Sequence, residues 1–234
     1  MARLLGTLAR WSLIPFLALL AWALGGAFFA SARSILGAGF IFWCGGGFLF
    51  RALSHLLWNR MGKDDPLGFL DTLEHELTHA LAGYLTLCPP VSLSATLKSG
   101  GEVELKGANP VAVLAPYFLP LWCLTAALIG LAVKPGLQQA WNQGVFFLWG
   151  WFLWRLAAEY RWRQTDLHAY GFVFSTLLTA NLLILSAGLL LWMRGIGDWR
   201  WIPAAVGGFF DTLSGMAEML RGSGKTGAGG NPGP

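Results

Sequence analysis

The sequence predicts an all-α polytopic membrane protein of about six transmembrane helices, with a short β-hairpin after the third helix. Of the 234 residues, 55% are hydrophobic and 12% are charged, whereas soluble domains carry about 25% charged residues. A soluble fold of this length would expose more apolar surface than water tolerates. The composition therefore excludes a disordered protein, a coiled coil and an ordinary cytosolic domain, and it makes the lipid bilayer a direct partner.

The net charge of +4 does not indicate a nucleic-acid partner. The Lys and Arg residues stand singly, mainly at the edges of apolar segments, where they suit orientation signals and lipid headgroup contacts. No dense basic patch with interleaved aromatic residues is present in the sequence. The three cysteines, Cys44, Cys88 and Cys123, are odd in number and lie in or beside apolar segments, so they predict no disulfide framework.

Six apolar segments of about 20 residues can each cross a hydrocarbon core of about 30 Å, and they form a single transmembrane domain over residues 1–202. A signal peptide is an alternative for the first segment, because Ala30-Ser31-Ala32 resembles a cleavage site. Its apolar run is longer than signal peptides carry and favours a retained helix. Glycines in the second segment allow neighbouring helices to approach closely. The predicted spans are 11–30, 35–58, 66–87, 110–133, 138–158 and 167–193.

The third span starts at Asp64-Asp65-Pro66, since acidic residues ahead of a proline are typical of a helix start, and it ends before Pro89-Pro90. Over residues 91–106 apolar and polar residues then alternate around a Ser-Gly-Gly turn, which predicts a β-hairpin. The apolar members are Val91, Leu93, Ala95, Leu97, Val103 and Leu105. Lipid does not tolerate open sheet edges, so we expect the hairpin in protein, in a water-filled cavity or at the interface.

The second half of the chain adds three spans, a surface helix and a tail. The fourth span contains Pro116 and Pro120 and is expected to be kinked or broken. The most polar connection, residues 159–166, joins the fifth span to the sixth. Residues 203–220 are typical of an interfacial amphipathic helix, and the Gly-rich residues 221–234 predict a disordered tail. The distribution of Lys and Arg among the connections favours a cytoplasmic N-terminus.

An H-E-x-x-H motif, His75-Glu76-Leu77-Thr78-His79, lies inside the third predicted helix. Residues four apart share a helix face, so both imidazoles can reach one zinc ion. Glu76 lies beside that face and can take a proton from zinc-bound water. The alternative is a pair of histidines that cap or pair within a helix bundle. Ionisable side chains are expensive in a membrane helix and indicate function by default, which favours the metal site.

A catalytic zinc needs a third protein ligand and an open position for water. Asp166 precedes the last long span, where a carboxylate also favours a helix N-terminus. His168 and Glu159 are nearby alternatives. Asp166 could instead be a plain N-cap, a role that Thr165 could equally fill. The residues alone place Asp166 only slightly ahead of His168.

The run from His75 to Gly83, within a hydrophobic helix, and Asp166, ahead of a later transmembrane helix, resemble the site-2-protease-like intramembrane zinc metallopeptidases of bacteria. The hairpin, Asn109-Pro110 and the proline-containing run at 115–120 add to the resemblance. It covers residues 71–178, under half of the chain.

In that family two histidines and a distant aspartate bind zinc, and the motif glutamate activates water. The resemblance therefore implies His75, His79 and Asp166 as ligands of one catalytic Zn²⁺, Glu76 as general base and a location in the bacterial inner membrane. The family's third ligand is usually followed by glycine, whereas Leu167 follows Asp166 here. The chain also shows no PDZ-like insert.

The expected activity is hydrolysis of peptide bonds in a membrane-protein or peptide substrate, within or beside the bilayer. The hairpin, through Leu93, Ala95 and Leu97, could bind an extended substrate by strand addition, or it could be a structural flap. Asn109 could donate a hydrogen bond to the substrate backbone or oxyanion, or it could serve a turn.

Two other classes of function compete with the protease. A non-catalytic zinc-binding membrane scaffold, or an inactive relative of the proteases, would need the ligands but not the base. An ion or metal transporter would use intramembrane His, Glu and Asp side chains as a relay.

Overall fold

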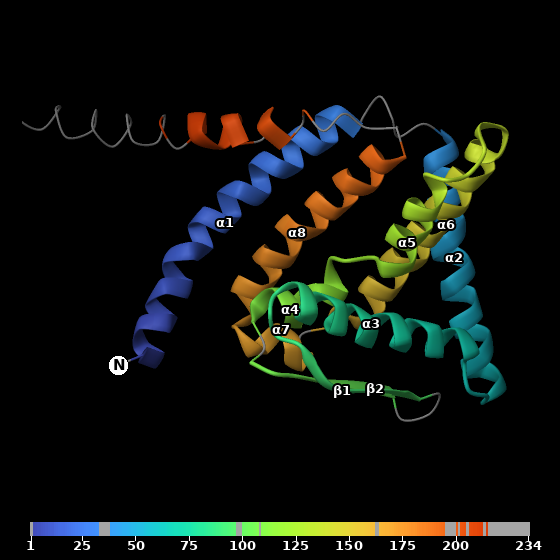
Figure 1. The fold of residues 1–234 in the computed structure, drawn as a ribbon, viewed down its shortest axis with the longest axis horizontal. Helices are drawn as coiled ribbons and strands as arrows, with labels where there is room; N and C mark the ends of the chain where they lie inside the picture. Colours follow the sequence, from blue (N-terminus) through green and yellow to red (C-terminus); the bar gives the residue numbers. More distant parts are fainter. Residues whose placement is uncertain are drawn as a thin grey trace, which may run out of the picture.

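The computed structural model describes residues 2–32, 38–96, 100–107, 109–161 and 164–194, and residues 200, 202–204, 206–212 and 214. These residues are mostly helical, with one two-stranded antiparallel hairpin, as the sequence predicts. The elements in chain order (Figure 1) are α1 (Ala2–Ala32), α2 (Ala38–Met61), α3 (Pro66–Leu85), β1 (Pro90–Thr96), β2 (Gly100–Leu105), α4 (Pro110–Leu114), η1 (Ala115–Tyr117), α5 (Leu121–Gly130), η2 (Pro135–Leu137), α6 (Gln138–Glu159), α7 (Thr165–Ala169) and α8 (Phe172–Met193).

The long helices form two inclined pairs. Helix α1 packs along α8, and α2 packs along α6, with α5 also against α6. Helix α3 runs crosswise from the lower end of α2 toward the lower end of α8, and the hairpin lies beneath α3 (Figure 1). The elements that carry the H-E-x-x-H motif and the hairpin therefore lie together at one end of the bundle.

Three described helices are long and apolar enough to cross a membrane, over Trp11–Phe29, Gly39–Met61 and Phe172–Met193. The segments Pro110–Tyr117 and Leu121–Gly130 become a fourth if they are taken as one span, bent by 79°. The bend follows the predicted break, since Pro116 lies in η1 and Pro120 immediately precedes α5. Helix α6 is long enough, but its glutamine, asparagine and tryptophan residues lower its hydropathy. Six spans are therefore not shown.

Helix α3 differs most from its expected role as an upright third span. It starts as predicted, because Asp65 caps it through a hydrogen bond from Leu67 N–H (3.0 Å) and Pro66 occupies the first turn. However, it lies across the end of α2 and α6 rather than beside them (Figure 1). Its acidic residues Asp71 and Glu74 are buried against those helices, where they pair with Arg51 of α2 and Arg155 of α6.

Glycines set the close packing of α2 on α6. A methyl group on Gly47 would overlap the backbone of Phe147, and a methyl group on Gly150 would overlap the carbonyl of Cys44. By contrast, a methyl group on Gly45 would meet no atom within 4 Å. The small residues at these two crossing points let the backbones approach. Gly47 has the role predicted for glycines of the second span, whereas Gly150 of α6 was not predicted.

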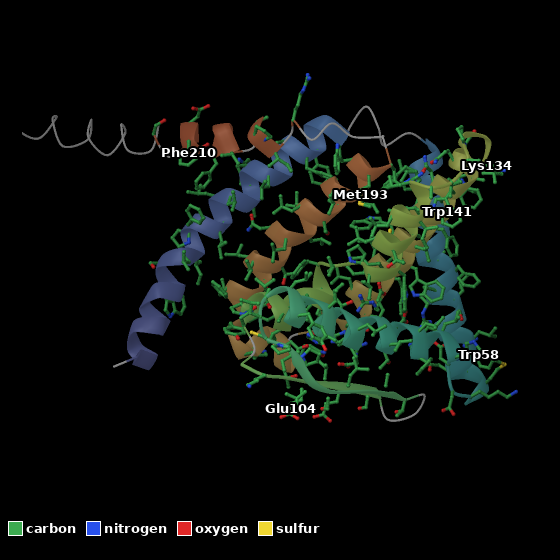
Figure 2. The ribbon with its side chains drawn as sticks, viewed as in Figure 1. Trp58, Glu104, Lys134, Trp141, Met193 and Phe210 are labelled. Atoms are coloured by element: carbon green, nitrogen blue, oxygen red, sulfur yellow. The ribbon has the colours of Figure 1, made fainter. Side chains whose placement is uncertain are left out.

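The hairpin forms where the alternating pattern predicts it. Leu93 pairs with Val103 and Ala95 pairs with Gly101, with an irregularity in register between Pro90 and Ser92. Both strands contact α3, whereas Glu104 points away from it (Figure 2). Leu97 lies outside the described residues.

The C-terminal segment is described in part. Residues 202–204, 206–212 and 214 are helical, and Phe209 packs edge-on against Phe16 of α1, with ring centroids 5.0 Å apart. Residues 215–220 of the expected interfacial helix and the expected tail at 221–234 lie outside the described residues.

Candidate metal centre

The structure brings His75, His79 and Asp166 together. One ligand atom from each residue lies within 4.8 Å of the other two. The Nε2 atom of each imidazole is 3.7 Å from Asp166 Oδ2. Helix α3 supplies both histidines, one turn apart, and the first turn of α7 supplies the aspartate.

The donor set and its spacing fit a zinc ion. Zinc bound tetrahedrally at about 2.0–2.1 Å places neighbouring ligand atoms roughly 3.4 Å apart, close to the 3.7 Å between Asp166 and each histidine. Two imidazoles and one carboxylate leave a fourth position open, as in catalytic zinc sites. These three residues could therefore hold the metal.

Each imidazole is oriented by an acceptor on its other nitrogen. His75 Nδ1 donates to Glu159 Oε2 (3.1 Å), and His79 Nδ1 donates to the carbonyl of Ala112 (2.9 Å). A carbonyl and a carboxylate only accept hydrogen bonds, so Nδ1 of each ring carries a proton, and in the neutral imidazole that binds a metal the lone pair is then on Nε2. Both Nε2 atoms then face Asp166, the arrangement that metal-ligating histidines require.

Asp166 is held as a carboxylate. Tyr117 Oη donates to its Oδ2 atom at 3.1 Å. Burial raises the pKa of the Asp166 carboxyl, but the two imidazoles beside it outweigh burial and lower the pKa below its ordinary value. A charged carboxylate is the form that binds a cation.

Glu76 borders the same cavity and is 7% exposed. Strand β2 lies directly against it, because a methyl group on Gly101 would come within 2.5 Å of Glu76 Cγ and 2.8 Å of Oε1. Glycine at this point of the strand therefore lets the hairpin approach the proposed base.

A cavity of about 340 Å³ surrounds these side chains. Its wall comes from the motif helix, strand β2, helix α4 and the segment around Asp166, and not from β1. The lining residues are His75, Glu76, His79, Gly101, Glu102, Val103, Leu105, Val113, Gln164, Thr165 and Asp166. No sequence pattern marked Val113, Gln164 and Thr165 as residues of the cavity wall. Gln164 and Thr165 could have been found from their position just before Asp166 in the sequence.

The other predicted site residues lie elsewhere. Leu93 and Ala95 belong to β1 and do not line the cavity. Asn109 caps α4 by accepting the N–H of Ala112 (2.9 Å). His168 is exposed, stacks near Phe172 with ring centroids 5.9 Å apart, and does not join the metal-binding group found among the described residues. Glu159 is not a member of that group, but it accepts a hydrogen bond from His75.

Two buried ion pairs made by one arginine, Arg51, fix the start of α3. Arg51 Nη2 of α2 lies 2.6 Å from Asp71 Oδ2, and Arg51 Nη1 lies 2.9 Å from Asp65 Oδ2. Trp151 Nε1 of α6 donates to the other Asp71 oxygen at 2.6 Å. Asp71, although it lies within the polar run of the motif helix, therefore joins α3 to α2 and α6 instead of binding metal.

All the ligand atoms, their acceptors and the cavity wall come from this one chain. Comparison of the chain with models of protein families, with curated proteins and with solved structures finds no match. The function is therefore inferred from the side chains of the site.

Proposed function

We propose that this protein is an intramembrane zinc metallopeptidase that hydrolyses peptide bonds of membrane-associated substrates. The observation that carries the proposal is the convergence of His75, His79 and Asp166 within 4.8 Å, with Glu76 in the same cavity. Two histidines one helical turn apart, a carboxylate and an adjacent glutamate are the groups that zinc peptidases use.

The side chains divide the chemistry among them. Zinc held by the three ligands would supply a water of lowered pKa and polarise the scissile carbonyl. Glu76 accepts the proton of the attacking water and delivers it to the leaving amine. Glu159 and the carbonyl of Ala112 keep the two imidazoles in the ligating orientation.

We place an extended substrate along strand β2, beside this site. In the two-stranded sheet one edge of β2 pairs with β1, while residues of β2 line the cavity. A substrate helix must unwind before its amides can react, and the freed backbone can pair with a sheet edge by strand addition. The apolar side chains of Val103, Leu105 and Val113 in the wall suit apolar substrate residues.

We further propose five membrane crossings, by α1, α2, the bent pair α4–α5, α6 and α8, with α3 and the hairpin at one interface. Trp58 and Glu104 lie at one end of the bundle, and Lys134 and Met193 lie at the other (Figure 2). The N-terminus of α1 lies at the end that holds the hairpin (Figure 1). Exposed Arg60, Lys63 and Lys106 lie in segments at this end, which favours the cytoplasmic side of a bacterial inner membrane.

Replacement of the base alone tests the activity. In cells that express Glu76→Gln in place of the wild type, we expect uncleaved membrane peptides to accumulate, because the ligands stay and proton transfer is lost. Quantitative mass spectrometry of the membrane fraction measures this. An unchanged set of membrane peptides, with zinc retained, would favour a non-catalytic scaffold.

A further inference from the structure

One buried arginine contacts three separate parts of the structure around the metal centre. The side chain of Arg155 in α6 is 1% exposed. Its Nη1 atom donates to Glu159 Oε2 at 3.0 Å, and its Nη2 atom donates to the carbonyl of Pro116 at 3.0 Å. Its Nε atom lies 3.3 Å from Glu74 Oε2. Arg155 does not line the cavity, so it acts on the site through these contacts.

The first contact leads to a histidine ligand. Arg155 and His75 share one oxygen, Glu159 Oε2, at 3.0 and 3.1 Å. The guanidinium therefore fixes the position of the atom that accepts the Nδ1 proton of His75. Partners of this kind keep the tautomer and the ring orientation of a metal-binding histidine.

The second contact leads to the aspartate ligand. The carbonyl of Pro116 belongs to the turn that carries Tyr117. Tyr117 Oη in turn donates to Asp166 Oδ2 at 3.1 Å. One guanidinium thus holds the supports of ligands from two different helices, α3 and α7.

The third contact balances charge. The Glu74 side chain is 2% exposed and immediately precedes His75, and its Oε1 atom accepts the N–H of Trp122 at 3.0 Å. A buried carboxylate without a cation is strongly destabilising. A lysine could supply the charge at position 155 but not the planar fork that reaches three acceptors in fixed directions.

We propose that Arg155 is a positioning residue of the metal centre, which raises zinc affinity by holding Glu159 against His75 and the Pro116 turn against Asp166. The inference rests on the proposed zinc-binding function of the same site. The proposal gives Arg155 two distinct roles. Its positive charge is required by the fold, and its forked geometry is required by the metal centre.

The test compares zinc affinity in the purified full-length protein, measured by competition with a chromophoric chelator. Arg155→Lys keeps the charge and is expected to weaken zinc binding by about 10- to 100-fold, as loss of such outer partners does. The absorption bands of the Co²⁺-loaded protein are expected to shift, because the ligand orientation changes. Neither readout depends on a substrate.

Arg194→Lys is the matched control. Arg194 is 7% exposed, and its guanidinium donates to Asn142 Oδ1 (2.6 Å), Gln138 Oε1 (2.5 Å) and the carbonyl of Ala127 (3.2 Å). It packs among helix ends remote from the metal centre, so we expect wild-type zinc affinity. An equal loss of affinity in both variants would show a general packing defect and overturn the proposal.

Glu159→Gln is a second variant that leaves Arg155 paired with Glu74. It keeps the shape of the side chain but removes the charge that Arg155 and His75 share, and we expect a loss of zinc affinity of about 10-fold. Wild-type affinity in this variant, or an affinity within twofold of wild type in Arg155→Lys, would overturn the proposal.

The proposed peptidase activity and this inference can fail separately. If Arg155→Lys loses zinc affinity while the wild-type protein cleaves no membrane peptide, the inference stands and the peptidase does not. A wild-type protein that binds no zinc would overturn both.

Discussion

At the scale of single residues, the candidate metal centre is organised by hydrogen bonds from groups outside the three proposed ligands. His75 and His79 each have an acceptor on Nδ1, and Asp166 accepts the hydroxyl of Tyr117. These hydrogen bonds orient the side chains so that Nε2 of each histidine faces Oδ2 of Asp166. The fold itself thus places the three side chains where they could hold a cation.

The choice of third ligand gives a direct residue-scale prediction. Asp166→Ala should lose most bound zinc, because it removes an oxygen 3.7 Å from both imidazoles. His168→Ala should keep its full amount of bound zinc, because His168 is exposed. Elemental analysis of the two purified variants measures this. Loss of zinc in His168→Ala with retention in Asp166→Ala would reverse the assignment.

At the scale of secondary-structure elements, the orientation of α3 depends on two buried carboxylates in the N-terminal half of the motif helix, Asp71 and Glu74. Near its start, Arg51 of α2 pairs with Asp71 and lies over the ring of Trp154, 4.8 Å from its centroid. Nearer the motif, Arg155 of α6 faces Glu74. These pairs hold α3 across the bundle.

Removal of the ion pair between Arg51 and Asp71 should destabilise the fold. Asp71→Asn removes the nearer of the two carboxylates that pair with the buried Arg51 guanidinium. Breaking a buried pair outright costs about 3–5 kcal/mol, which is the upper bound here because Asp65 remains. The matched control, Glu104→Gln on the exposed face of the hairpin, should stay within about 0.5 kcal/mol of wild type. Thermal unfolding in detergent compares the two, and equal stability would contradict the role given to Asp71.

The contact between α2 and α6 offers a second matched pair of variants. Gly47→Ala should destabilise the protein by about 1–3 kcal/mol, since its methyl group would overlap the Phe147 backbone. Gly45→Ala, with no atom within 4 Å of the added group, should be neutral or slightly stabilising in a helix. Unfolding in detergent again measures the difference; an equal effect at both positions would contradict the packing.

At the scale of the whole molecule, the proposed topology of five crossings puts the hairpin and the end of α2 on the same side of the membrane. A six-span topology would put them on opposite sides, since α3 would cross between them. The orientation of α3 therefore decides the side from which the site is reached.

Single cysteines introduced at Lys63 and Glu104, both exposed, should react with a membrane-impermeant maleimide from the cytoplasmic side. A cysteine at Lys134 should react from the opposite side. Labelling of inverted vesicles and of intact spheroplasts measures sidedness. Opposite sidedness of positions 63 and 104 would restore the six-span topology.

The sequence predicted the local parts of this structure and missed the long-range ones. An α-helix fixes the relation of residues four apart, so His75 and His79 could be paired from spacing alone. Alternation predicted the hairpin, and Pro116 and Pro120 predicted the break. The crosswise orientation of α3 and the contacts of Arg155 depend on packing between segments far apart in sequence, which no local pattern encodes. Asp166 was placed with the histidines by resemblance rather than by spacing.

The most direct test of the central claim uses a membrane peptide that accumulates in Glu76→Gln cells. The peptide is incubated in liposomes with purified wild-type protein or with Glu76→Gln, each loaded with one zinc per chain. Wild type is expected to yield two products whose masses sum to the substrate plus one water, while Glu76→Gln leaves it intact. Equal cleavage by both proteins, or by neither, would contradict a zinc peptidase with Glu76 as its base.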